Sequence, residues 1–223
     1  LKERERELDL LRQIQSRVLR HNVRNDLSII KNRVNDLSRD ADHDREQVVS
    51  NIASAADRLL SVSTNVQAAE DIVESDQTPV EIDLTTLLER KVQTYREMYP
   101  STSFELSTPP RCLVETVPAM DHAIQNLVEN AVEHNDATEP VVSVSARQRA
   151  DAAVVTIDDN GPGIPEQELA VFEAHEETPL QHSVGAGLWV AWWAIEVSDA
   201  TIAFDTGQQG TTVTIRIPTG RLR

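Results

Sequence analysis

Two long segments at the start of the chain repeat apolar residues mostly at steps of three and four. Residues 1–38 contain neither Gly nor Pro, and the apolar residues of their stripe fall at Leu8, Leu11, Ile14, Val18, Leu19, Val23, Leu27, Ile30, Val34 and Leu37. Residues 44–74 carry a second stripe at Ile52, Ala55, Leu59, Val62, Val66, Ala69 and Val73. This spacing predicts two helices that pack along their stripes, and the polar stretch 38–42 between them predicts an antiparallel hairpin.

A single hairpin of this kind buries its apolar stripes poorly. We therefore expect it to pair with a second copy of itself in a homodimeric four-helix bundle. A solvated spacer is the alternative, and the length of the stripes argues against it. The stretch 75–79, Ser-Asp-Gln-Thr-Pro, has the composition of a linker. It predicts a helical domain over residues 1–75 and a second domain over residues 76–223.

Beyond the linker, short β-branched runs are mixed with amphipathic segments. The predicted strands are 80–82, 104–106, 112–115, 141–150, 152–157, 201–206 and 211–217, and the predicted helices are 84–98, 118–133 and 187–197. We expect 141–150 and 152–157 to pair antiparallel, and the last two strands to form a closing hairpin around 207–210. This order predicts an α+β sandwich, in which helices cover one face of a mixed sheet.

The charge pattern narrows the classes of function. With a formal net charge of -16 at pH 7, the chain lacks the basic surface that nucleic acids require, so we expect no nucleic-acid partner. Of its 21 basic residues, only Lys2, Lys31 and Lys91 are lysines. Many acidic residues with few lysines are typical of a halophilic protein, whose surface repulsion is screened by salt, although ordinary acidic proteins overlap this composition.

Cysteine usage and hydropathy bear on the compartment. The single Cys112 excludes an internal disulfide and suits a reducing compartment. The best apolar run, 185–195, is too short to span a membrane, and we find no signal peptide. We therefore expect a cytoplasmic fragment of a longer protein, with no membrane contact of its own and any membrane attachment upstream of it.

The octapeptide 158–165, Asp-Asp-Asn-Gly-Pro-Gly-Ile-Pro, follows an apolar β-branched run. This order predicts that Asp159 lies on a rigid strand and is followed by a turn in which Gly161 and Gly163 let other groups approach the backbone closely. A carboxylate in such a position can accept a hydrogen bond from an exocyclic amine. Taken alone, the octapeptide also fits an ordinary tight turn.

Two further motifs carry polar groups on apolar helices. Asn126 and Asn130 are four residues apart and therefore share one helix face. Buried amides need partners, and a side-chain carbonyl is a good ligand for Mg²⁺, although a satisfied polar pair at a helix end is the alternative. The loop 183–188, Ser-Val-Gly-Ala-Gly-Leu, opens another apolar helix, and its glycines expose backbone N–H groups as an anion site requires.

The order Asn-x-x-x-Asn, Asp-Asn-Gly-x-Gly, Gly-x-Gly-Leu resembles the ATP-binding domain of sensor histidine kinases, whose fold is shared with gyrase, Hsp90 and MutL-type ATPases. The resemblance covers roughly residues 80–218. It implies that Asn130 binds Mg²⁺, that Asn126 lines the phosphate site and that Asp159 accepts from the adenine amino group. It implies a nucleotide site completed by His134, Gly161, Gly163, Gly185, Gly187 and Leu188, with Thr211 or Thr212 near adenine. Glu133 departs from the family, which commonly has a Lys at this position.

His21 lies two residues from both Leu19 and Val23, so it points away from the apolar stripe and shares its exposed face with Asn25. An exposed imidazole is a workable nucleophile near neutral pH, although a lone surface His is the alternative. The segment resembles the phospho-acceptor box of histidine kinases. By this resemblance His21 attacks the γ-phosphate of ATP, and Asn25 orients water when the partner is dephosphorylated. Asn22 replaces the family's acid; its amide can fix the imidazole tautomer but cannot accept a proton.

Together these features predict the core of a sensor histidine kinase, which binds Mg-ATP, phosphorylates His21 and passes the phosphoryl group to the receiver domain of a response regulator. Two alternatives remain. A degenerate kinase would act as an ATP-binding scaffold or a response-regulator phosphatase, as Asn22 and Glu133 favour. A conformational ATPase of the gyrase or Hsp90 kind would leave the helical hairpin unexplained.

Overall fold

The structure is a computed structural model that describes residues 27–35, 45, 48–53, 55–56, 59, 78–165, 169 and 186–219. Residues 27–35 and 48–53 are helical. Most of the predicted hairpin, including His21, Asn22 and Asn25, lies outside the described residues, as does Gly185 of the predicted glycine loop. Among the helices that are described, none has both the length and the hydropathy of a membrane-spanning segment.

Strands and helices are mixed along residues 78–219. The strands are β1 (Val80–Asp83), β2 (Ser103–Ser107), β3 (Leu113–Thr116), β4 (Val141–Gln148), β5 (Ala152–Asp159), β6 (Thr201–Gly207) and β7 (Gly210–Pro218). The helices are α3 (Leu84–Met98), α4 (Ala119–Glu133) and α6 (Ala186–Glu196). Each predicted element of this region is confirmed to within two residues. Strand β5 runs two residues further than expected, so Asp158 and Asp159 are its last two residues.

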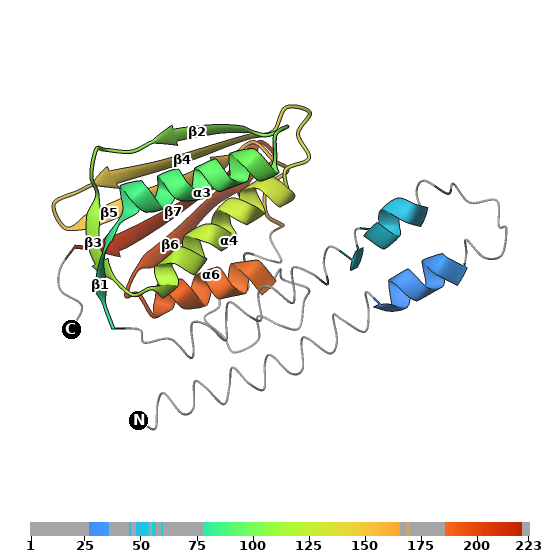
Figure 1. Ribbon diagram of the computed structural model, residues 1–223, viewed down its shortest axis with the longest axis horizontal. Coiled ribbons are helices and arrows are strands. Elements are labelled where there is room, and N and C mark those ends of the chain that lie inside the picture. Colours follow the sequence, from blue (N-terminus) through green and yellow to red (C-terminus); the bar gives the residue numbers. More distant parts are fainter. Residues whose placement is uncertain are drawn as a thin grey trace, which may run out of the picture.

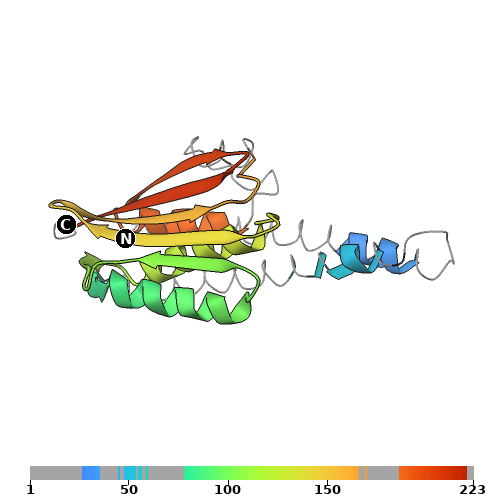
Figure 2. The ribbon, with the colours of Figure 1, turned by 90° about the horizontal axis from the view of Figure 1, so that it is seen from above.

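Five strands form one sheet in the order β2-β4-β5-β7-β6. Strand β2 is parallel to β4, whereas the other neighbouring pairs are antiparallel. A separate antiparallel ribbon joins β1 to β3. The three helices lie across one face of the five-stranded sheet (Figure 1), and the strands fan out in a twisted arrangement when seen from above (Figure 2). The predicted α+β fold with a mixed sheet covered on one face is therefore confirmed for this region.

The core lies between the helices and the inner face of the sheet. Residues on this face alternate with polar residues on the outer face, as expected for a sheet covered on one side. Strands β5, β7 and β6 place Ile157, Val213 and Phe204 opposite one another in one inner row. The preceding inner row is also apolar and consists of Val155, Ile215 and Ile202. Period-two alternation in the sequence thus sets which side chains face the helices.

Helix α4 is the element that connects the core to the end of the sheet. Pro118 occupies its N-cap position, where the missing proline N–H costs nothing because the first N–H groups of a helix have no partner within it. Met120, Ile124 and Val128 repeat at four-residue steps and are fully buried. The helix packs against α6 and β5 and ends at Glu133. Its burial fixes the position of the polar residues that share the helix.

Candidate functional site

A row of polar side chains ends the otherwise apolar inner face of the sheet. Asp159 on β5 lies opposite Thr211 on β7, and Thr211 lies opposite Thr206 on β6. The two inner rows before it are apolar, so polarity changes abruptly at the strand ends. Thr211 is 4% exposed, although buried hydroxyls are costly without hydrogen bonds. The row Asp159–Thr211–Thr206 therefore marks the candidate site.

The Asp159 carboxylate lies in a partly apolar setting but receives backbone hydrogen bonds. The N–H of Gly161 donates to its Oδ1 at 2.8 Å, and the backbone of Thr211 also bonds to it. Burial raises the pKa of Asp159 above its ordinary value, and these two backbone bonds oppose the increase. When ionised, the carboxylate is a strong acceptor for a ligand N–H.

The turn after Asp159 is folded against the hairpin between β6 and β7. The N–H of Ile164 donates to Thr206 Oγ1 at 2.8 Å. Gly163 has a φ of +84°, and a Cβ at this position would overlap the backbone oxygen of Gly207. Both features require glycine here, because side chains favour negative φ and the hairpin backbone fills the space. The turn is thereby held beside the polar row.

Asn160 connects the same turn to the segment that follows α4 through hydrogen bonds. Its Oδ1 accepts hydrogen bonds from the N–H of Val141 at 2.8 Å and from Nδ2 of Asn135 at 2.9 Å. Its Nδ2 donates to the backbone oxygen of Glu139 at 2.9 Å. Asn135 follows the C-cap of α4, and its Cα would lie 3.3 Å from a Cβ added at Gly161. The end of α4 therefore contacts the turn that follows Asp159.

Helix α4 carries the two predicted amides. Asn126 is 5% exposed, and its Nδ2 donates to the backbone oxygen of His122 at 2.9 Å. Within the described part of the chain, Nδ2 of Asn130 is buried and has no hydrogen-bond partner. An unsatisfied buried amide is unfavourable, so its presence favours a partner beyond the described residues. His134 is exposed at the C-cap, five residues from Glu129 and one from Asn135.

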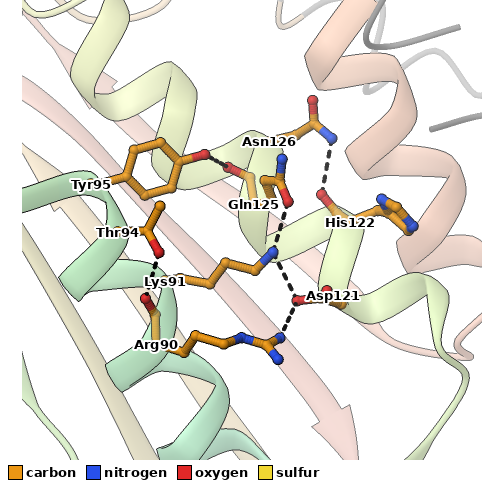
Figure 3. Close-up of polar contacts among 8 residues, drawn as sticks. All are labelled: Arg90, Lys91, Thr94, Tyr95, Asp121, His122, Gln125 and Asn126. Carbon is orange, nitrogen blue, oxygen red and sulfur yellow. Dashed lines mark hydrogen bonds and ion pairs between the residues drawn. The ribbon is translucent and has the colours of Figure 1, made fainter. Parts of the chain in front are cut away.

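The opposite side of α4 faces α3 through a polar contact (Figure 3). Lys91 is 12% exposed, and its Nζ lies 2.7 Å from Oε1 of Gln125 and 3.0 Å from Oδ1 of Asp121. Figure 3 shows Gln125 turned toward Lys91, while the neighbouring Asn126 points to the other side of the helix. The contact with α3 therefore sets the rotation of α4 that directs Asn126 away from α3.

Two acidic residues near the end of α4 lie on the side of α3. Burial raises the pKa of Glu129; the negative charge of Glu133 adds to this increase and Lys91 opposes it. The hydroxyl of Tyr99 donates to Oε1 of Glu133 at 3.2 Å. Burial, with a contribution from Glu133, raises the pKa of Tyr99 to about 12. Tyr99 therefore remains a hydrogen-bond donor to Glu133 across the neutral range.

The structure brings most of the predicted residues of the second domain to one end of the sheet. Asp159, Gly161, Gly163 and Thr211 form one cluster, and α4 with Asn126, Asn130 and His134 ends against it. Gly187 and Leu188 lie in the first turn of α6, which packs against α4, and Leu188 is buried.

Four residues at this end of the sheet were given no role from the sequence, although Asn160 lies in the octapeptide and Gly210 in the predicted hairpin turn: Asn135, Asn160, Thr206 and Gly210. Thr206 continues the inward alternation of Ile202 and Phe204, so this pattern could have indicated it. Gly210 has a φ of +129°, and a Cβ there would overlap the backbone oxygen of Asp159. The contacts of Asn135 and Gly210 join distant parts of the chain, and no local pattern signals them.

Residues 116–221 match the family described as histidine kinase-, DNA gyrase B-, and HSP90-like ATPase. The chain is 29% identical over 175 residues to the sensor-type histidine kinase PrrB of Mycobacterium leprae, an alignment that covers 76% of this chain and 39% of the relative. The chain therefore spans about two fifths of that protein.

Solved structures give the same picture of the fold. The ATP-binding domain of PrrB from Mycobacterium tuberculosis is 28% identical, with a TM-score of 0.53 and coverage of 65% of this chain and 99% of that one. Histidine kinase ThkA, solved in complex with the response regulator protein TrrA, gives a TM-score of 0.66 at 19% identity. That alignment covers 98% of this chain and 65% of ThkA, and at this identity it bears on the fold alone.

Proposed function

The chain carries, over residues 116–221, an ATP-binding domain of the histidine kinase-, DNA gyrase B- and HSP90-like ATPase family, and we propose that it is a sensor histidine kinase core that phosphorylates His21. The observation that carries this proposal is the row Asp159–Thr211–Thr206, which ends an apolar sheet face beside the amide-bearing helix α4. A carboxylate of this kind accepts from an amine, and amides beside it offer oxygen and N–H groups to phosphates.

In the proposed complex, the adenine base lies against Asp159. The carboxylate accepts a hydrogen bond from the exocyclic amine, and Thr211 lies beside it. Gly161 and Gly163 shape the turn, because a side chain at either position would meet neighbouring atoms. The phosphates extend toward α4 and the start of α6. The residues that bind them are Asn126, Asn130, His134, Gly185, Gly187 and Leu188.

The residues at α4 fit a bound Mg²⁺. Within the described part of the chain, the buried Nδ2 of Asn130 is an unpaired donor that suits a phosphate oxygen, and the Oδ1 of the same amide is the type of ligand that this cation prefers. We assign the ion to Asn130, with phosphate oxygens and water completing its shell. When bound, Mg²⁺ neutralises negative charge on the phosphates during transfer.

His21 is the proposed phospho-acceptor. A ring nitrogen attacks the γ-phosphorus of ATP, a nitrogen–phosphorus bond forms, and the bond to the bridging oxygen breaks to release ADP. Asn22 holds the imidazole in the reactive tautomer by hydrogen bonding. An aspartate of a response-regulator receiver domain then takes the phosphoryl group, and Asn25 orients water when that aspartyl phosphate is hydrolysed. The ThkA–TrrA complex, in which a histidine kinase is bound to a response regulator, supports the choice of partner.

We place His21 on a hairpin domain of residues 1–75 and the nucleotide site on residues 76–223. The hairpin forms a homodimeric four-helix bundle in this proposal. Leu27 and Val34 belong to its predicted apolar stripe and are 53% and 46% exposed in the single chain. Pairing with a second copy would remove this apolar surface from water.

Incubation with γ-labelled ATP and Mg²⁺ tests the proposal. The wild-type chain should acquire an acid-labile, base-stable label, as expected for phosphohistidine. His21→Gln should bind ATP as tightly as the wild type but acquire no label. A wild-type chain that binds ATP without becoming labelled would favour the scaffold or phosphatase alternative. Steady release of phosphate without a labelled protein would favour a conformational ATPase.

A further inference from the structure

Thr206 lies between the turn that follows Asp159 and the side chain of Thr211. Its Oγ1 accepts a hydrogen bond from the N–H of Ile164 at 2.8 Å and lies 3.0 Å from Oγ1 of Thr211. The register places Thr206, Thr211 and Asp159 side by side on the inner face of three adjacent strands. Thr206 is therefore the outermost member of a connected polar row.

The hydroxyl protons of this row have two possible arrangements. A threonine hydroxyl has one proton to donate and two lone pairs that can accept. If Thr206 donates to Thr211, the proton of Thr211 is free for a ligand. If Thr211 donates to Thr206, Thr211 can offer a ligand only an acceptor. The arrangement therefore decides what Thr211 presents beside Asp159.

The contact with Ile164 favours the first arrangement. Accepting the N–H of Ile164 polarises the Thr206 hydroxyl, and a polarised hydroxyl is the better donor in a hydrogen-bonded chain. Thr206 then donates to Thr211, and the Thr211 proton is released for the ligand. All hydrogen bonds of the row are then donated in the same direction, from the Ile164 N–H to Thr206, from Thr206 to Thr211, and from Thr211 toward the ligand beside Asp159.

This arrangement matches one purine and not the other. Asp159 offers an acceptor and Thr211 a donor, side by side. Adenine presents the complementary pair, an exocyclic amine that donates beside a ring nitrogen that accepts. Guanine presents the reverse, an oxygen that accepts beside a ring N–H that donates. Building on the proposed ATP-binding function, we propose that Thr206 is a positioning residue that determines specificity for adenine over guanine by fixing the direction of the Thr211 hydroxyl.

The outer face of the same strands provides a matched control. Thr212 and Asp158 lie opposite each other there, and the hydroxyl of Thr212 donates to Oδ1 of Asp158. Thr212→Val removes a threonine hydroxyl, the same group that Thr206→Val removes, from the residue next to Thr211 on β7. It leaves the inner row intact, because successive side chains of a strand point to opposite faces.

The test is the ratio of dissociation constants for ATP and GTP, measured by calorimetric titration of the full chain. Thr206→Val should reduce the preference for ATP about tenfold, the effect of one lost hydrogen bond, chiefly by weakening ATP binding. Thr206→Ser keeps the hydroxyl and should retain the wild-type preference for ATP. Thr212→Val should not change this preference. A purely structural loosening of the turn would weaken both nucleotides equally.

Several outcomes separate this inference from the function on which it rests. An unchanged ATP-to-GTP ratio in Thr206→Val would overturn the role of Thr206 and leave the ATP site standing. Failure of the wild type to bind ATP would instead overturn the proposed function. Should Thr206→Val not fold, as judged by circular dichroism, Thr206→Ala and Thr211→Val provide the same test. Both must reduce the preference for ATP over GTP, and retention of the wild-type preference by either overturns the inference.

Discussion

Asp159 and Thr211 lie directly opposite each other on β5 and β7, at the point where the inner face of the sheet changes from apolar to polar. Next to them, Ile157 and Val213 are almost fully buried. The same strand pairing that forms the core therefore also places the candidate site. A change that shifts the register by one residue would move the whole row to the outer face.

Gly210→Ala tests this pairing. The new Cβ would overlap the backbone oxygen of Asp159, and a φ of +129° is unfavourable for any residue with a side chain. We expect a loss of about 3 kcal/mol in the free energy of unfolding, measured by urea denaturation. Gly207→Ala in the same hairpin is the control, because a Cβ there meets no atom within 4 Å. Equal effects of the two changes would contradict the account.

Asn160→Ala should loosen the connection between α4 and the turn after Asp159. It removes three side-chain hydrogen bonds, and the residue is exposed enough for water to compensate in part. We expect a loss of about 1.5 kcal/mol of stability. Asn135→Ala should cost less, and the double variant should cost less than the sum, because the two amides bond to each other. Simple additivity would indicate that the Asn135–Asn160 bond is energetically unimportant.

The raised pKa of Glu129 predicts a pH-dependent stability. A carboxyl whose pKa is higher in the folded than in the unfolded state favours folding when protonated, so its contribution becomes unfavourable as pH rises from the unfolded pKa through the folded pKa. Glu129→Gln should therefore raise the melting temperature at pH 7 and have little effect near pH 4. Glu89→Gln, an exposed change on α3, is the control. A Glu129→Gln variant that is less stable at pH 7 would contradict this assignment.

The acidic composition predicts a dependence on salt. With a formal net charge of -16 at pH 7, the folded chain repels itself at low ionic strength, and molar salt screens this repulsion. The melting temperature should rise as KCl increases from 0.1 to about 2 M. A melting temperature that is constant or falls over this range would argue against a halophilic surface.

Local patterns in the sequence were sufficient for much of this fold. Alternating runs predicted the strands, and Pro118 with the repeat of apolar residues predicted α4. The octapeptide motif pointed to Asp159 because the glycines that follow this residue indicate a tight turn, which is a local feature of the sequence. Resemblance to a known family indicated Thr211 or Thr212, and the structure places Thr211 opposite Asp159 on the inner face. These predictions depend on residues that are neighbours along the chain.

Long-range contacts could not be predicted in the same way. The alternation along β6 indicates which face Thr206 takes, but its place beside Thr211 and Asp159 follows from the register of β6 with β7 and of β7 with β5, which depends on the packed core. Asn135 and Asn160 are 25 residues apart, and their bond follows from the place where α4 ends. Packing of α3 on α4 leaves Lys91 only 12% exposed beside Asp121, which no local pattern in the sequence indicates. Each of these depends on how distant elements meet.

The most direct test of the central claim is calorimetric titration of ATP into Asp159→Asn and Asp158→Asn. The two residues are adjacent on β5 but face opposite sides of the sheet. Asp159→Asn loses the charged acceptor for the adenine amine, and we expect ATP affinity to fall by roughly thirty- to a hundredfold. Asp158→Asn should bind ATP as the wild type does. Wild-type affinity in Asp159→Asn, or an equal loss in both variants, would contradict the assignment of the nucleotide to this end of the sheet.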